Sequence, residues 1–150
     1  CDPILIEQVL LNLVKNAAEA IDLADLPAAR RRIELRVVPR QTADNDTVVE
    51  FSITDTGPGM PQDVLSRIFE AFFSTKPQGL GIGLSLCRSI IESHRGRLKA
   101  ENLYNAGSRV GCRFVFTLPV DIPSSANAPP PGPTAATADA VPSPSTAAIP

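Results

Sequence analysis

Two asparagines, Asn12 and Asn16, stand four residues apart in a segment that is otherwise rich in Leu, Val and Ala. Residues at this spacing lie one turn above another on the same face of a helix. Asn is a mediocre helix former, because its side chain competes for backbone hydrogen bonds. Two of them inside a helix suggest a use for their oxygens, and Mg²⁺ accepts amide oxygens beside water and phosphate. An exposed polar helix face is the alternative that the spacing leaves open.

A second candidate group is Asp55-Thr56-Gly57-Pro58-Gly59, which follows the β-rich segment Val48–Thr54. Glycine allows positive φ and close approach of a ligand to the backbone, and Pro58 stiffens the turn. The Asp55 carboxylate would accept a hydrogen bond from an amino group held in a fixed place, such as the exocyclic amine of adenine. An ordinary Asp-Gly turn in a sheet protein has the same composition, so both interpretations stand.

A third group is the glycine run Gly79-Leu80-Gly81-Ile82-Gly83-Leu84, which leads directly into a predicted helix. The start of a helix exposes unpaired backbone N–H groups and the positive end of the helix dipole, so phosphate oxygens bind there. The run is not a Walker loop, since no Lys-Ser/Thr pair follows, and no strand stands directly before it as in a dinucleotide-binding fingerprint. A flexible hinge is the alternative.

The segment between the two glycine groups concentrates aromatic residues. Three of the six phenylalanines of the chain lie in Ile68-Phe69-Glu70-Ala71-Phe72-Phe73-Ser74-Thr75-Lys76-Pro77. We expect these rings to anchor a loop whose polar tip, Ser74 to Lys76, is free to move. Lys76 would then reach a terminal phosphate as the loop closes. A hydrophobic staple beside a solvated lysine is the alternative.

Hydrophobic spacing predicts the elements that would hold these groups. The expected helices run from Asp2-Pro3 to about Ile21, over Gln62–Phe69 and over Gly83–Glu92, and Phe72–Ile82 is an expected loop. The expected strands are Ile33–Val38, Val48–Thr54, Arg97–Leu103 and Val110–Leu118, with a polar loop over Pro39–Thr47 and Gly107 in the last turn. Strands grouped in hairpins with helices between them predict an α/β fold, a two-layer sandwich with helices on one face of a sheet.

Composition divides the chain into a folded part, residues 1–120, and a tail, residues 121–150, that is rich in Ala, Pro, Ser and Thr. The tail has too few branched-apolar and aromatic residues to offset its ordering entropy, so we expect a disordered tail or linker. No apolar run reaches the roughly 20 residues of a membrane span and no signal peptide is visible. We expect no membrane contact by this chain, although the full protein is free to carry an anchor elsewhere.

Charge and cysteine usage narrow the class of partner and the compartment. The formal net charge is -2, and the basic cluster Arg30-Arg31-Arg32 is short. Because nucleic-acid binding needs a broader basic face, we expect no nucleic-acid partner. The three cysteines follow no metal or redox spacing and are expected to be small core or surface residues. Their odd number suits a reducing cytosol, so the predicted location is cytoplasmic.

In their order along the chain, these groups resemble one family closely: the ATP-binding catalytic domain of bacterial sensor histidine kinases, within the Bergerat-fold ATPases. Leu11–Ala20 resembles the asparagine box, Asp55–Gly59 the first glycine box, Ile68–Phe73 the phenylalanine box and Gly79–Leu84 the second glycine box. The resemblance runs from Asp2 to about Pro119. Phe-Phe-Ser-Thr-Lys-Pro with a short lid is similar to nitrogen- and oxygen-responsive sensor kinases. The resemblance implies a mixed, mostly antiparallel sheet backed by about three helices. The first strand of this sheet would precede Asp2.

The resemblance also implies roles at matching positions, with ATP and Mg²⁺ as the ligands. Asn16 would hold Mg²⁺, Asn12 would support the phosphates and Asp55 would read the adenine amine. The remaining nucleotide-binding positions would be Gly57 and Gly59 at the pocket floor, Gly79, Leu80, Gly81, Gly83 and Leu84 around the phosphates, and Lys76 on the closing lid. Asn12, Asn16 and Lys76 would form the catalytic set.

The residue at position 12 favours phosphate transfer over hydrolysis. Hydrolytic members of the wider group carry a glutamate four residues before the metal-binding asparagine, where it activates water as a general base. Asn12 is neutral and cannot accept a proton, whereas phosphoryl transfer relies mainly on positioning and charge neutralisation. The resemblance therefore implies transfer of the γ-phosphate to a histidine on a separate dimerisation and phosphoacceptor domain, in the missing upstream part of the same protein. A response regulator would act downstream, in two-component signal transduction.

Two residues limit this interpretation. His94, the only histidine, lacks the surroundings of a phosphoacceptor and is expected to be a structural residue near a helix end. Arg95 replaces the first of two glycines that usually follow this histidine in the family, which puts the tightness of that turn in question. The alternative function is an ATP-binding regulatory or sensor module of the same fold that carries out no phosphotransfer.

Overall fold

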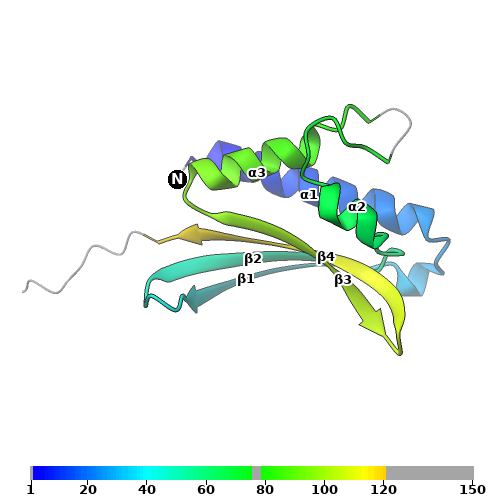
Figure 1. The fold of residues 1–150 in the computed structure, drawn as a ribbon. Coiled ribbons are helices and arrows are strands. Elements are labelled where there is room, and N and C mark those ends of the chain that lie inside the picture. The colour runs from blue at the N-terminus through cyan, green and yellow to red at the C-terminus, as the bar shows by residue number, and fades with distance from the viewer. Residues whose placement is uncertain (1, 76–78, 121–150) are drawn as a thin grey trace, which may run out of the picture.

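A four-stranded sheet with three helices on one side forms the fold (Figure 1). The computed structural model describes residues 2–75 and 79–120; Cys1, Lys76 and the expected tail, residues 121–150, lie outside that description. The α-helices are α1 (Pro3–Leu23), α2 (Gln62–Arg67) and α3 (Gly83–Ser93), and a short 3-10 helix, η1 (Ala28–Arg30), precedes the first strand. The strands are β1 (Ile33–Gln41), β2 (Thr47–Asp55), β3 (Arg97–Asn105) and β4 (Ser108–Pro119), in the spatial order β1-β2-β4-β3.

The expected two-layer α/β class is confirmed, and each of the three strand pairings in the described sheet is antiparallel. Alternate residues of β4 face the helices and are buried, among them Phe114 and Phe116. Phe116 stacks on Phe51 of β2, its partner in the register, with ring centroids 4.6 Å apart. The period of two along the strand thus builds the floor on which the helices pack.

The long helices follow the predicted periodicity. The buried positions of α1 are Ile6, Val9, Leu13, Ala17 and Ile21, and those of α3 are Cys87, Ile90 and Ile91. This spacing of three and four residues places one apolar stripe of each helix on the sheet. α1 begins as expected, because the Asp2 carboxylate accepts hydrogen bonds from Ile4 N (2.9 Å) and Leu5 N (3.4 Å). Within the described ranges, no helix combines the length and apolar content of a membrane span.

Two predicted boundaries were wrong. The loop expected from Pro39 begins later, because β1 continues to Gln41. β1 is an edge strand, where a proline without an N–H is tolerated. The helix expected over Gln62–Phe69 ends at Arg67, after which Ile68 and Phe69 turn toward the core.

The far end of α3 is closed by the chain itself. Gly96 N donates to Ile91 O and Arg95 N donates to Glu92 O, each at 2.9 Å, which is the Schellman pattern of a helix C-terminus. Arg95 holds the left-handed position of this turn, with φ 60°, so the turn forms without the glycine usual in the family. His94 lies 2.8 Å from Ile90 O through Nδ1, and its Nε2 accepts a hydrogen bond from Asp2 N at 2.9 Å. The structural role expected for His94 is confirmed.

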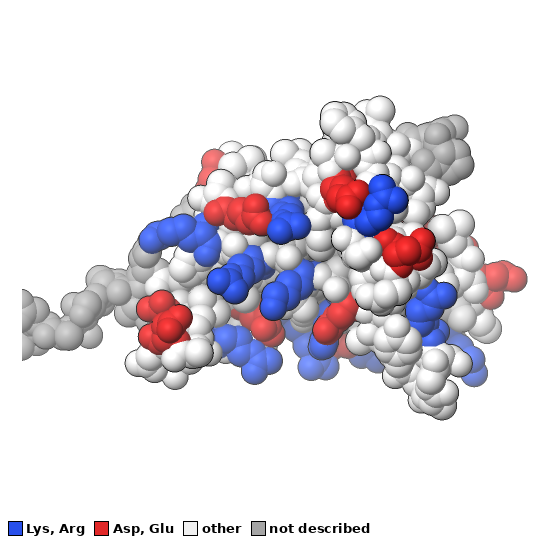
Figure 2. Space-filling view, in the orientation of Figure 1, with Lys and Arg blue, Asp and Glu red and all other residues white. Residues whose placement is uncertain are grey.

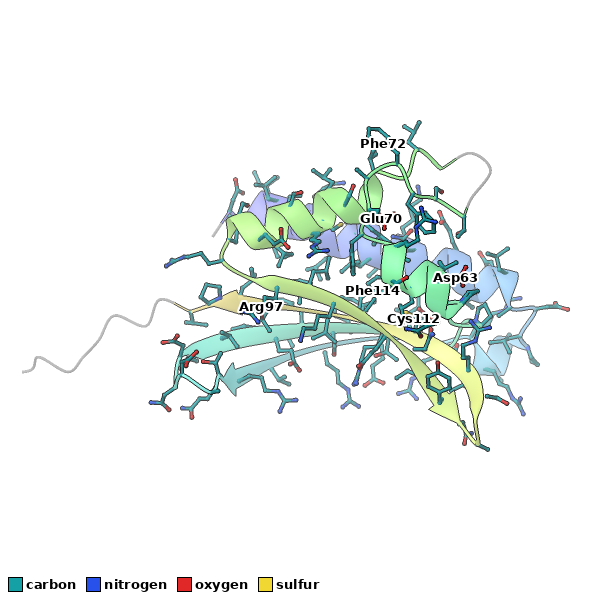
Figure 3. The ribbon with its side chains drawn as sticks, in the orientation of Figure 1. Asp63, Glu70, Phe72, Arg97, Cys112 and Phe114 are labelled. Carbon is teal, nitrogen blue, oxygen red and sulfur yellow. The ribbon has the colours of Figure 1, made fainter. Side chains whose placement is uncertain are left out.

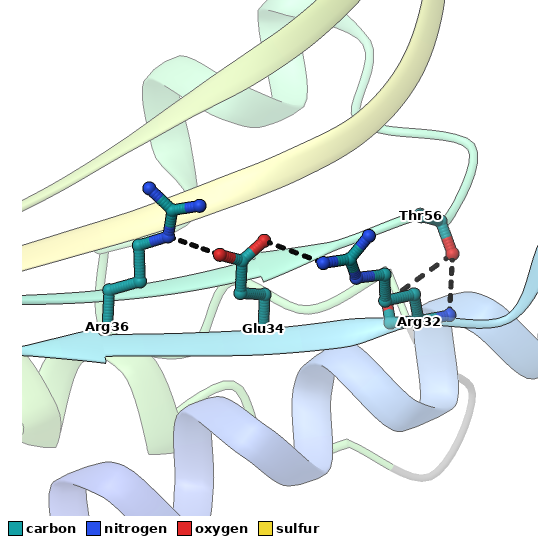
Figure 4. A network of polar contacts seen from close by, with 4 residues as sticks. All are labelled: Arg32, Glu34, Arg36 and Thr56. Atoms are coloured by element: carbon teal, nitrogen blue, oxygen red, sulfur yellow. Dashed lines mark hydrogen bonds and ion pairs between the residues drawn. The ribbon is translucent and has the colours of Figure 1, made fainter.

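On the face shown in Figure 2, acidic and basic side chains are interspersed rather than separated by sign. At the start of β1, Glu34 forms ion pairs with Arg32 and Arg36, which lowers the pKa of the Glu34 carboxyl below its ordinary value (Figure 4). The hydrogen bond from Arg36 is the main cause of that shift. These pairs are exposed, so they contribute little to stability.

Candidate functional site

A cavity of about 490 Å³ lies between α1, the first glycine loop and the segment that leads into α3. This volume is within the range of small-molecule sites. Its lining includes nine predicted positions: Asn12, Asn16, Asp55, Gly59, Gly79, Leu80, Gly81, Gly83 and Leu84. Gly57 lies directly behind this lining, and Lys76 is outside the described residues. Segments far apart in sequence are therefore brought around one space.

The asparagine pair stands on the face of α1 that meets the start of α3. Asn16 Nδ2 donates to Asn12 Oδ1 at 3.4 Å, and both side chains are half-buried. A Cβ placed on Gly83 would lie 3.0 Å from Asn12 Nδ2, so Gly83 is the residue that lets α3 begin this close to α1. Two amide groups and the backbone of a helix start thus lie at the same end of the cavity.

Asp55 lies at the opposite end of the cavity, at the last position of β2, and its side chain is only 1% exposed. Its Oδ1 accepts hydrogen bonds from Gly57 N (2.8 Å) and Cys112 N (3.2 Å). Burial raises the pKa of the Asp55 carboxyl above its ordinary value, and these two hydrogen bonds oppose the rise. Because both bonds fall on Oδ1, Oδ2 is the oxygen that can accept from a ligand.

The loop after Asp55 is tied to the sheet at several points. The Thr56 hydroxyl accepts from Arg32 N at 3.0 Å (Figure 4). It also donates to Arg30 O at 2.8 Å, which joins the loop to the residues just before β1. A Cβ on Gly57 would lie 2.9 Å from Asp55 Oδ1 and 3.1 Å from the Ala20 backbone. Glycine at 57 therefore lets the loop turn tightly against α1 and donate to Asp55.

The phenylalanine segment is anchored as predicted by two of its three rings. Phe69 packs edge-on against Phe114, with centroids 6.5 Å apart, and the Arg67 guanidinium lies 4.4 Å from the Phe73 ring centroid. Phe72 was expected to anchor the loop as well, and this was wrong. It has φ 65° and is 83% exposed, and it lies at the outer part of the loop (Figure 3).

Two cysteines are buried close to the cavity. Cys112 lines it on the helix-facing side of β4 beside Phe114 (Figure 3), and Cys87 lies on the buried face of α3. Burial raises the pKa of Cys112 to about 12 and that of Cys87 to about 11, so both thiols are neutral at physiological pH. The expectation of small core residues is confirmed for these two. No three His, Cys, Asp or Glu side chains in the described ranges gather as a metal site.

Sequence reasoning missed Cys112 and Asn102. The Asn102 side chain accepts from Met60 N at 2.8 Å and donates to Met60 O at 2.7 Å. The pairing of β4 with β2 brings Cys112 to the cavity, and the pairing of β3 with β4 brings Asn102 to Met60 of the adjoining loop. The signal that would have found them is the register of these strands, which local sequence patterns do not contain.

Comparison with known proteins gives consistent matches. A family model described as histidine kinase-, DNA gyrase B-, and HSP90-like ATPase matches residues 1–122. The chain is 45% identical over 118 residues to sensor protein FixL of Bradyrhizobium diazoefficiens, covering 79% of this chain and 21% of FixL. It is 38% identical over 122 residues to the C4-dicarboxylate transport sensor protein DctS of Rhodobacter capsulatus, covering 81% of this chain and 17% of DctS. The chain thus spans about a fifth of the length of these relatives.

Solved structures of similar fold lead to the same group. The catalytic domain of histidine kinase ThkA superposes with a TM-score of 0.62 at 38% identity, covering 79% of this chain and 68% of that one. The mycobacterial sensor histidine kinase MprB superposes with a TM-score of 0.64 at 28% identity, covering 79% and 72%. Both identities are high enough for the likeness to extend beyond the general fold.

Proposed function

This chain belongs to the histidine kinase-, DNA gyrase B- and HSP90-like ATPase family, and on that premise we propose that it is the ATP-binding catalytic domain of a protein-histidine kinase. The observation that carries the proposal is the single cavity around which Asn12, Asn16, Asp55 and the glycines before α3 meet. Its two ends match the two ends of ATP. A buried carboxylate suits the adenine amine, so we call the end of the cavity at Asp55 the base end. A glycine-rich helix start suits the phosphates, so we call the end at Asn12 and Asn16 the phosphate end.

At the base end, Asp55 is proposed to accept a hydrogen bond from the adenine amine through Oδ2. Its Oδ1 is already held by two backbone N–H groups, so the carboxylate is fixed before the base arrives. Such preorganisation reduces the entropy cost of binding. Gly59 and Met60 form the adjoining wall of the cavity.

At the phosphate end, Asn16 is proposed to hold Mg²⁺ and Asn12 to orient the phosphate chain. A metal ion held there would supply neutralisation of the phosphate charge. What supports this role is the donor chemistry, because Mg²⁺ bound with a nucleotide needs only one or two protein oxygens beside water and phosphate. The scarcity of carboxylates there is therefore compatible with Mg-ATP. Lys76 is proposed to reach the terminal phosphate from the lid.

Transfer rather than hydrolysis is proposed because position 12 holds a neutral amide, which cannot take a proton from water. The γ-phosphoryl group would pass to an imidazole nitrogen of a histidine on a phosphoacceptor domain of the full protein, with ADP as the other product. A response regulator is proposed as the next acceptor. These steps and a cytoplasmic location are proposals for the whole protein, of which this chain is one domain.

The rim of the phosphate end supports such a partner. Phe72, Leu80 and Leu86 are 83%, 76% and 51% exposed, and Ile82 lies between them in sequence. Exposed apolar groups in one region mark interaction sites. An acceptor histidine must approach this end to reach the γ-phosphate, so we propose the phosphoacceptor domain as the occupant of this apolar rim.

Nucleotide binding is tested by calorimetry with ATP and Mg²⁺ on the 150-residue chain. Asp55→Ala and Asn16→Ala are each expected to lower ATP affinity by at least tenfold, since hydrogen bonds to charged groups contribute about 1.5–3 kcal/mol. The Asn16 variant should also lose the dependence on Mg²⁺. Unchanged affinity in both variants would remove the site assignment.

Transfer is tested by mixing the chain with a separately made helical hairpin that carries the phosphoacceptor histidine and with labelled ATP. Acid-labile label on the hairpin supports the kinase. ATP binding without label transfer supports the alternative, a regulatory or sensor module. Leu86→Lys should reduce transfer about tenfold without changing ATP affinity, because Leu86 lies on the rim and not in the cavity lining. Tyr104→Lys is the control, because Tyr104 is an apolar residue of β3 that is 60% exposed, and it should leave transfer unchanged.

A further inference from the structure

Asn102 is bound to the main chain of the first glycine loop by both of its polar groups. Its Oδ1 accepts from Met60 N at 2.8 Å and its Nδ2 donates to Met60 O at 2.7 Å, across 42 residues of sequence. These two hydrogen bonds to the main chain of Met60 resemble those that a residue makes to a neighbouring strand, although Met60 lies in a loop. A half-buried amide satisfied in this way is costly to remove, since Met60 would lose two partners at once.

Both ends of the loop Asp55–Met60 are hydrogen-bonded to the same pair of neighbouring residues on β3 and β4. Asn102 of β3 is the register partner of Cys112 of β4. Cys112 N donates to Asp55 Oδ1 at 3.2 Å, at the first residue of the loop, while Asn102 holds Met60 at the last. The distance between the loop ends is therefore fixed by the sheet rather than by the loop itself.

Gly59 fits closely into the same place. It has φ +66°, and a Cβ there would lie 2.8 Å from Asn102 Oδ1 and 3.0 Å from Gly111 O. The loop thus lies against β3 and β4 with no room for a side chain at 59. Gly59 and Met60 line the cavity, whereas Asn102 does not, so any effect of Asn102 on a ligand must pass through the loop.

We propose that Asn102 is a positioning residue that sets the width of the base end, and thereby the selectivity for adenine; this inference rests on the proposed ATP site. The base would lie between Asp55 on one side and Gly59 and Met60 on the other. When Asn102 holds Met60, this slot keeps the purine edge against Asp55 Oδ2. Without Asn102, the Met60 side of the loop moves away and the base no longer has one fixed place.

The test compares ATP with inosine triphosphate, which has an oxygen where adenine has its amine. Calorimetry with Mg²⁺ on the 150-residue chain should show tighter binding of ATP by at least tenfold. Asn102→Ala should weaken ATP binding by about tenfold and change inosine triphosphate binding by less than about twofold. The ratio of the affinity for ATP to that for inosine triphosphate should therefore approach one. Asn105→Ala, an exposed asparagine at the end of the same strand, should keep the wild-type ratio.

Urea unfolding of the same variants separates positioning from stability. A purely structural Asn102 would lower the unfolding midpoint and leave the ratio at its wild-type value, and this result would overturn the inference. Asn102→Asp decides the matter if the alanine variant is too unstable, because it keeps the shape and sets a carboxylate oxygen against Met60 O. It should also bring the ratio toward one. A wild-type chain that binds no ATP overturns the proposed function itself, whereas ATP binding with unchanged ratios in both variants overturns only the role of Asn102.

Discussion

The two ends of helix α3 are built in opposite ways. At its C-terminus, Ile90, Ile91 and Glu92 give their carbonyls to the chain that follows, and His94 joins the end to the start of α1. At its N-terminus, Ile82 provides no side-chain cap, and the preceding residues are largely exposed. The same helix is therefore closed by its own chain at one end and open at the other.

This difference indicates where the helix serves the fold and where it serves a ligand. The start of α1 shows that the chain is able to close a helix N-terminus, since Asp2 caps two backbone N–H groups there. The start of α3 has Ile82 at the cap position and no side-chain cap, and its first residue, Gly83, lies against Asn12 of α1 beside the cavity. Changes at the open end should affect nucleotide binding, and changes at the closed end should affect stability.

The largest effect is expected from Gly81→Ala, at the open end. Gly81 has φ +67°, and a Cβ would lie 2.5 Å from Phe72 C, so the alanine must push the loop and the glycine segment apart. We expect ATP affinity to fall about 100-fold, or about 2.7 kcal/mol, because the backbone groups proposed to bind phosphate are displaced. Calorimetry measures the affinity, and urea unfolding should show a loss of stability of about 1–2 kcal/mol, which is the cost of a Cβ in the left-handed region.

Gly107→Ala is the matched control for this variant. Gly107 also has positive φ, +82°, but a Cβ there meets no atom within 4 Å. It carries the same kind of backbone strain at the tip of the β3–β4 hairpin, away from the cavity. If both variants lost affinity equally, the open end of α3 would have no special relation to the nucleotide.

The next effect is expected from Gly96→Ala, at the closed end. A Cβ on Gly96 would lie 2.1 Å from Thr117 O and 2.8 Å from Ile91 Cγ2, so the turn must move off β4. Overpacking of this kind costs about 1–3 kcal/mol. We expect the free energy of unfolding, measured in urea, to fall by an amount near the top of this range. ATP affinity of the folded protein should change by less than about twofold. A loss of affinity as large as that of Gly81→Ala would mean that the two ends are not independent.

Local sequence patterns predicted the elements well, and the family resemblance implied the grouping of the candidate residues. The apolar spacing of α1 and α3 and the alternation in β4 follow from geometry that any amphipathic element obeys. The asparagine pair and the glycine run were expected near each other, and the structure brings them to one cavity. Lys76 lies outside the described residues, so its role stays a prediction.

The residues that sequence reasoning missed depend on non-local pairing. Asn102 meets Met60, and Cys112 meets Asp55, only because β4 lies between β2 and β3. The outward position of Phe72 depends on a positive φ that a non-glycine residue adopts rarely, so composition suggested burial instead. The extension of β1 past Pro39 depends on the edge position of the strand, which is a property of the whole sheet.

The smallest effect is expected at Arg95, where the glycine variant should be more stable than the alanine variant. Arg95 is held at φ 60° in the Schellman turn, a conformation that costs a residue with a Cβ about 1–2 kcal/mol. Arg95→Gly relieves this strain but adds backbone entropy to the unfolded chain, which offsets about 0.5–1 kcal/mol. Arg95→Ala keeps the strain and removes the rest of the side chain with its contacts. The glycine variant should therefore be more stable than the alanine variant by about 0.5–1 kcal/mol in urea unfolding, with ATP affinity equal in both. An alanine variant as stable as the glycine variant would show that the closed end of α3 is not strained at Arg95, and that the chain closes this turn without glycine at no cost.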